Sequence, residues 1–190
     1  ARADSLVVNA PKWLFTPMDC SVLWTRHPAL LKRTFSLTPA YLETAEQEVA
    51  LSQSDYSFQL GRRFRALKLW FVIRAFGTDG LQERLRFHCG LARTLAGWIE
   101  GEAGWEVVAP VPMSVVCFRH RPAGTTDEVA LERHNASILE RVNASGTVFL
   151  SHTKLGGRYV LRMAIGNIRT REAHVAEAWR LLREAAGVTA

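Results

Sequence analysis

Long apolar runs, cysteine pairs and histidine pairs are all missing from this sequence of 190 residues. The longest apolar run is far too short to span a bilayer, so no membrane crossing is expected. The three cysteines are widely spaced and form no CxxC pair, which indicates buried thiols in a reducing compartment and predicts a cytoplasmic protein. The six histidines form no HxH or HxxxH pair, so no metal site is expected.

Lysine is also scarce, since only four of the 24 basic residues are lysines. Where arginine supplies nearly every surface cation, each lysine is a position at which an amine can be required. Lys12 has the apolar neighbours Val7, Val8, Trp13 and Leu14, which predict that it is buried. An unpaired buried ammonium tends to lose its proton, and the neutral amine is a nucleophile suited to Schiff-base chemistry. The alternative is a lysine at a strand end whose ammonium reaches solvent.

The net charge of +6 is confined to one stretch of the chain. Residues 61–93 contain eight basic and two acidic side chains, whereas the remainder is neutral. Such a stretch is compatible with a non-catalytic fragment that binds anions or nucleic acid. Phe64, Leu67 and Trp70 alternate with these bases at helical spacing, however, which favours a packed helix whose arginines pair with acidic groups.

Apolar periodicity predicts two domains, 1–102 and 103–190. In the first, strands are expected at 5–15, with a break at 9–11, and at 20–24. A long loop with one helical turn near 43–48 is expected at 32–59, followed by helices at 61–76 and 79–100. The second is expected to be an α+β domain with an antiparallel sheet and helices on one face. Its strands are predicted at 106–109, 114–119, 148–153 and 159–165, its helices at 127–143 and 171–186, and a hairpin turn at 156–157.

Six segments in order carry a resemblance that covers essentially the whole chain. They are Ala-Asp-Ser-Leu-Val-Val-Asn-Ala-Pro-Lys-Trp-Leu (3–14), Met-Asp-Cys-Ser (18–21), Thr-Pro-Ala-Tyr-Leu (38–42), Leu-Gly-Arg-Arg-Phe-Arg-Ala-Leu-Lys-Leu-Trp (60–70), Val-Cys-Phe-Arg (116–119) and Tyr-Val-Leu-Arg-Met-Ala-Ile-Gly-Asn (159–167). Together they resemble the group II pyridoxal-phosphate-dependent amino-acid decarboxylases, and among them the aromatic-L-amino-acid decarboxylases. The resemblance implies the end of a fold type I large domain (α/β), followed by the small α+β C-terminal domain.

The resemblance implies roles for four residues. Lys12 would form the Schiff base with pyridoxal 5'-phosphate, and Asn9 would lie at the cofactor phosphate. Tyr41 matches the tyrosine that protonates the substrate carbon after carbon dioxide leaves, although composition alone favours an ordinary loop aromatic. Gly61 would approach the cofactor phosphate of a partner subunit, which implies a homodimer; the alternative is a plain turn glycine before a helix.

Two departures from the family pattern limit these implications. Pro11 stands where the family usually has histidine. The family's upstream segments, which supply the aspartate for the pyridine nitrogen and the histidine that stacks on the ring, have no counterpart here. We therefore expect a whole enzyme that decarboxylates an L-amino acid, with an aromatic substrate favoured over a non-aromatic one, and an isolated chain that is inactive. No nucleic-acid or membrane partner is expected for such an enzyme.

Overall fold

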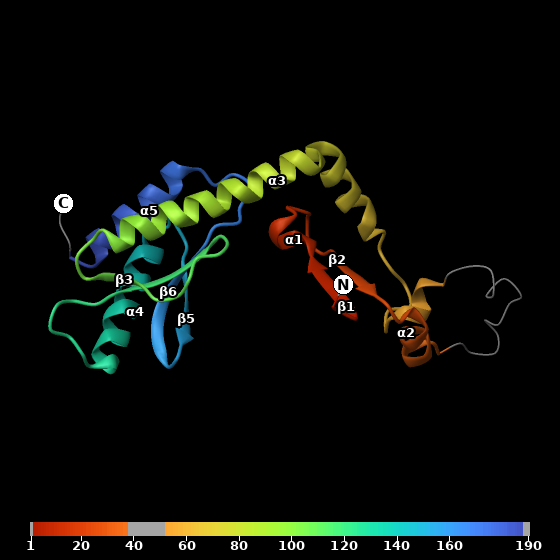
Figure 1. Ribbon diagram of the computed structural model, residues 1–190, viewed down its shortest axis with the longest axis horizontal. Coiled ribbons are helices and arrows are strands. Elements are labelled where there is room, and N and C mark those ends of the chain that lie inside the picture. Colours follow the sequence, from red (N-terminus) through yellow and green to blue (C-terminus); the bar gives the residue numbers. More distant parts are fainter. Residues whose placement is uncertain (1, 38–51, 188–190) are drawn as a thin grey trace, which may run out of the picture. The chain divides into compact units, whose positions relative to one another are not determined.

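The computed structural model describes residues 2–37 and 52–187, and the chain divides at Gly77 into two compact units (Figure 1). Unit 1 is residues 1–77 and unit 2 is residues 78–190. The long helix α3 (Arg65–Glu100) belongs to both, because Gly77 interrupts it with φ of 64° and ψ of 176°. The division at Gly77 lies before the predicted boundary at 102. The reason is that the second half of α3 packs into the core of unit 2.

Unit 1 is built on an antiparallel pair of strands, β1 (Ser5–Asn9) and β2 (Ser21–Thr25), in which Asn9 pairs with Ser21. Between them, the prediction that the strand resumes at Trp13 is wrong, because α1 (Ala10–Trp13) is one helical turn. Pro11 lies in its first turn, where the missing N–H costs no intrahelical bond.

The stretch predicted as a long loop contains helical structure at both of its described ends. Helix α2 (Pro28–Phe35) begins at a proline, and η3 (Gln53–Tyr56) is a single 3-10 turn. The helical turn predicted near 43–48 lies outside the described residues. Helix α3 then begins at Arg65, four residues later than predicted.

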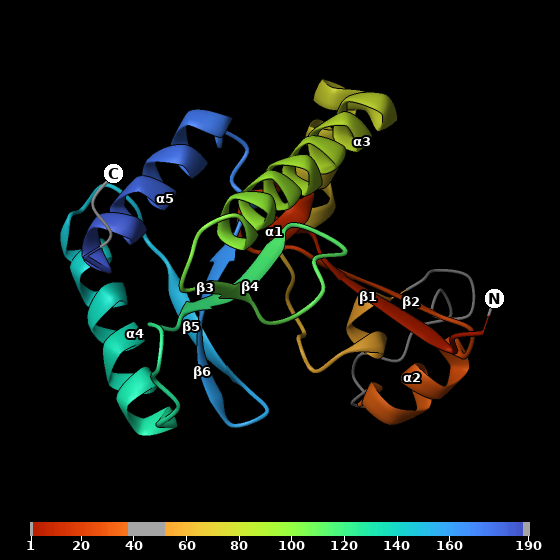
Figure 2. The same cartoon turned by 60° about the vertical axis from the view of Figure 1, so that its left-hand side comes forward.

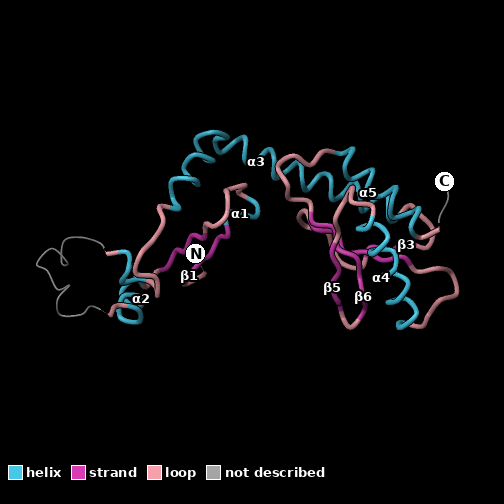
Figure 3. The backbone as a smooth tube through the Cα atoms, turned by 180° about the vertical axis from the view of Figure 1, so that it is seen from behind, coloured by secondary structure: helices cyan, strands magenta, loops and turns pink. Residues whose placement is uncertain are grey.

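Unit 2 contains a four-stranded antiparallel sheet in the order β3-β4-β6-β5. The strands are β3 (Trp105–Val107), β4 (Val115–His120), β5 (Ser151–Leu155) and β6 (Arg158–Ala164). Figure 3 shows β5 and β6 side by side. Their turn has φ values of 55° at Gly156 and 80° at Gly157, which confirms the predicted two-residue hairpin turn.

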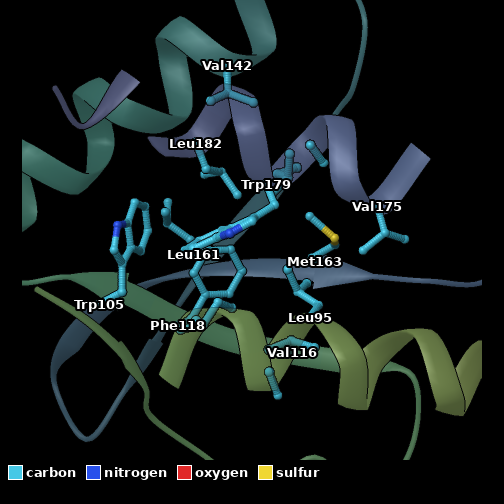
Figure 4. Close-up of a cluster of buried hydrophobic side chains, with 14 of the residues drawn as sticks. Leu95, Trp105, Val116, Phe118, Val142, Leu161, Met163, Val175, Trp179 and Leu182 are labelled. Atoms are coloured by element: carbon cyan, nitrogen blue, oxygen red, sulfur yellow. The ribbon is translucent and has the colours of Figure 1, made fainter. Parts of the chain in front are cut away.

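One face of this sheet forms the core of unit 2 with three helices. Helix α4 (Glu128–Ala144) and helix α5 (Glu172–Ala185) lie on the same side of the sheet (Figure 2), and the second half of α3 joins them. Phe118 of β4 and Leu161 of β6 lie in one buried cluster with Trp179 and Leu182 of α5 (Figure 4). The predicted α+β arrangement is confirmed, and no described helix could cross a membrane.

Candidate active site

Lys12 lies in α1, the single helical turn that follows β1. Its side chain is exposed, so the prediction of a buried lysine is wrong. Of the four apolar neighbours that suggested burial, Val7 is 64% exposed and the other three are only half-buried. The Lys12 amine is therefore accessible to a carbonyl compound without any rearrangement of unit 1.

The backbone around Lys12 is held by a buried anchor at Ala10, which has no exposed surface. The Ala10 N–H donates to the Cys20 carbonyl over 3.0 Å, and the Ala10 carbonyl accepts from the Leu14 N–H at 3.1 Å. The next residue, Phe15, has a φ of 52°, which is unusual for a residue other than glycine and requires support from its surroundings. Lys12 thus stands on a turn with a defined geometry, although its side chain is free to move.

Asn9 is the last residue of β1 and the N-cap position of α1. Its side chain is exposed and makes no capping hydrogen bond, so the amide can reach a ligand. Because Asn9 and Lys12 are three residues apart on adjoining elements, the structure brings these two predicted residues into one turn. An amide donor and a primary amine three residues apart suit a ligand that carries both an oxyanion and an aldehyde.

Gly61 lies in the stretch before α3 and is exposed. A Cβ atom placed on Gly61 would meet no atom of the described residues within 4 Å, so none of these residues requires a glycine there. Among the described residues, Gly61 makes no hydrogen bond or ion pair with Asn9 or Lys12. Tyr41, the remaining predicted site residue, lies outside the described residues.

Sequence reasoning missed an ion-pair cluster around Asp19. Its carboxylate accepts from Arg65 Nε at 2.7 Å and lies 3.7 Å from Lys68 Nζ. The hydrogen bond from Arg65 lowers the pKa of Asp19, and the charges of Arg65 and Lys68 act in the same direction. Two bases of the 61–93 stretch are therefore paired within unit 1. Arg74, a third, lies over the ring of Trp70 with 6.0 Å between the guanidinium and the ring centroid.

The residues present fit a cofactor that offers an aldehyde and a phosphate, namely an accessible amine at Lys12 and an amide at Asn9. In contrast, the described residues hold no group of three or more histidine, cysteine, aspartate or glutamate side chains that could bind a metal ion. The chemistry that this turn can support is therefore covalent attachment of a carbonyl compound.

Comparison with known proteins agrees with this chemistry. Residues 1–121 match the conserved domain of the pyridoxal-dependent decarboxylases. The chain belongs to this family. A tryptophan decarboxylase of Camptotheca acuminata is 39% identical over 189 residues, covering 98% of this chain and 38% of that protein. Tyrosine decarboxylase 4 of Petroselinum crispum is 43% identical over 188 residues, covering 96% of this chain and 37% of that protein.

A solved structure gives the same result for the fold. The crystal structure of Oryza sativa TDC with PLP and tryptamine matches with a TM-score of 0.91 at 34% identity, covering 98% of this chain and 39% of that chain. The two units are thus the fold of a pyridoxal-dependent decarboxylase over the matched part. This chain spans somewhat more than a third of the length of these relatives.

Proposed function

We propose that this chain is the C-terminal part of an enzyme that decarboxylates an aromatic L-amino acid with pyridoxal 5'-phosphate. The observation that carries the proposal is the accessible Lys12 amine on a fixed turn, in a chain that belongs to the pyridoxal-dependent decarboxylases. The aromatic substrate class is supported by the tryptophan and tyrosine decarboxylases among the similar proteins. The cytoplasm is the proposed location, because the three cysteines are free in the structure.

Pyridoxal phosphate supplies an electron sink for the pair of electrons left on the α-carbon when carbon dioxide departs. Lys12, in α1, would hold the cofactor through its Nζ atom. The Asn9 amide would donate a hydrogen bond to a phosphate oxygen. Two such contacts from this chain would limit rotation of the bound cofactor and so favour one alignment of the substrate bonds.

Gly61 and Tyr41 are the other two residues of the proposed site. The open space around Gly61 is compatible with the close approach of a second molecule, and we place the cofactor phosphate of a partner subunit there, as in a homodimer. Tyr41 is proposed to deliver the proton to the α-carbon, on the strength of its position in the Thr-Pro-Ala-Tyr-Leu segment. The aspartate for the pyridine nitrogen and the stacking histidine are assigned to an N-terminal portion that this chain does not contain.

The test uses an enzyme in which this chain is joined to its N-terminal portion. Lys12→Ala should abolish the visible absorbance of the protein-bound cofactor, whereas Lys32→Ala, a change at another lysine of unit 1, should leave it intact. A cofactor band that persists in Lys12→Ala would remove Lys12 from the proposal. A panel of aromatic and acidic L-amino acids separates the proposed substrate class from a non-aromatic one.

A further inference from the structure

Two adjacent residues between α1 and β2 contact the first residue of α3. Asp19 Oδ2 accepts from Arg65 Nε at 2.7 Å, and the Cys20 thiol lies 3.8 Å from the Arg65 carbonyl oxygen. Lys68, one helical turn further along α3, places its Nζ atom 3.7 Å from the other Asp19 carboxylate oxygen. Three contacts within unit 1 thus join the start of α3 to the segment that follows Lys12.

The same segment is joined to the turn that carries Lys12. The buried Cys20 accepts from the Ala10 N–H at 3.0 Å through its carbonyl oxygen, and Ala10 is the first residue of α1. A continuous set of bonds therefore runs from Arg65 through Asp19 and Cys20 to Ala10, two residues before Lys12. Displacement of Arg65 would be passed along this route to the backbone of α1.

We propose that Asp19 is a positioning residue for Lys12, which keeps α1 oriented by holding Arg65 and Lys68 at the start of α3. The inference rests on the proposed function, because it takes Lys12 as the residue that binds the cofactor. Asp19 does not touch the cofactor in this proposal. Through Arg65, Cys20 and Ala10, it sets the orientation of α1. That orientation decides the direction from which the Lys12 amine and the Asn9 amide approach a common ligand.

Asp19 also couples the two predicted ends of the site. Gly61 lies four residues before Arg65, so an extended backbone allows at most about 14 Å between them. Fixing Arg65 on Asp19 therefore limits where Gly61 can reach, at the same time as it orients α1. Asp19 itself is 54% exposed. An exposed ion pair contributes little to global stability, so its loss is expected to change reactivity at Lys12 more than folding.

The experiment measures how fast pyridoxal phosphate is trapped by borohydride reduction on each lysine of the 190-residue chain. Peptide mass spectrometry reads the yield at Lys12 against Lys154, which lies in unit 2 beside Glu132 and serves as the internal standard. Asp19→Asn should slow trapping at Lys12 by up to about fivefold, the upper range for an exposed ion pair, and leave Lys154 unchanged. Asp19→Glu should keep most of the wild-type rate.

Two further variants separate positioning from general damage to unit 1. Asp55→Asn removes another ion pair of unit 1, in which Asp55 lies 3.7 Å from Lys32, and should leave Lys12 trapping unchanged. The reversed pair Asp19→Arg with Arg65→Glu should recover part of the rate lost in Arg65→Glu alone. This comparison is made between two variants that both lack the native pair, so a rise in the Lys12 trapping rate remains informative when a single variant folds poorly.

The outcomes distinguish this inference from the proposed function. Equal Lys12 trapping in wild type and Asp19→Asn overturns the positioning role of Asp19 while Lys12 keeps its proposed role. An equal loss in Asp55→Asn, or no recovery in the reversed pair, overturns it as well. A wild-type chain in which Lys12 reacts no faster than Lys154 contradicts both proposals.

Discussion

Unit 1 carries the predicted site residues and almost no core, whereas unit 2 has a core and none of those residues. The buried residues described in unit 1 are Ala10, Thr16 and Cys20, and large side chains such as Trp24 and Trp70 are more than half exposed. In unit 2, three helices and one face of a sheet enclose a continuous apolar cluster. The comparison indicates that unit 2 can hold its own shape, while unit 1 keeps a small anchored turn within a largely exposed surface.

The largest expected effect comes from breaking the core of unit 2. Phe118 has no exposed surface and packs near Trp105, with ring centroids 6.0 Å apart. Phe118→Ala should lower the free energy of unfolding of unit 2 by about 3–5 kcal/mol through loss of burial and the cavity left behind. Urea unfolding followed by hydrogen exchange of unit 2 amides measures this. Trp70→Ser in unit 1, at a side chain 53% exposed, is the contrast and should change stability by less than about 0.5 kcal/mol.

Acid should weaken unit 2 through a pair of histidines. His120 Nδ1 and His134 Nε2 lie 2.7 Å apart, with the His120 ring against Trp105. Burial lowers the pKa of His120, with a smaller effect from His134, and burial also lowers the pKa of His134, with a smaller effect from Arg141. Because the folded-state pKa values lie below those of the unfolded chain, the stabilisation is present above the ordinary histidine range near pH 6.5 and is lost as the pH falls through the folded values.

Unfolding of unit 2 at pH 7.5 and pH 5 tests the histidine pair. The wild-type chain should lose stability at the lower pH, and the double variant His120→Gln with His134→Gln should lose less. Part of the acid sensitivity should remain in that variant, because burial also lowers the pKa of His88 in the same unit. An unchanged pH dependence in the double variant would show that these two side chains do not titrate on unfolding.

A smaller effect is expected at the start of α4. The Asp127 carboxylate accepts from the Val129 N–H at 3.0 Å and caps the helix. Asp127→Ala should cost about 1 kcal/mol of unit 2 stability, and Asp127→Asn, which can still accept this bond, should cost less. Thermal unfolding monitored by circular dichroism ranks the two variants, and equal losses would argue against the cap.

The strands and the hairpin of unit 2 were predicted well, because short stretches of sequence determine them. The glycine pair at 156–157 requires positive φ values, and the apolar alternation in β4 and β6 fixes which face is buried. The Lys12 environment was predicted wrongly, because apolar neighbours in sequence do not determine burial when few other elements cover them. The pairing of Asp19 with Arg65 spans 46 residues, and no periodicity in a single sequence reveals such a contact.

Helix α2 was missed because it has only eight residues, too few for a helical period to be recognised over the window of about 11–18 residues that such patterns need. The start of α3 was predicted four residues early because the basic and apolar spacing continues back to Gly61, although the helix begins at Arg65. The role of Tyr41 stays a prediction from the sequence.

Borohydride trapping of pyridoxal phosphate on the 190-residue chain tests whether the exposed turn of unit 1 presents Lys12 as the cofactor lysine. We expect Lys12 to be labelled faster than Lys32, Lys68 and Lys154, because the anchored turn holds Asn9 and Lys12 close in the chain, where both can meet one ligand. Uniform labelling of the four lysines would show that this turn gives Lys12 no such advantage.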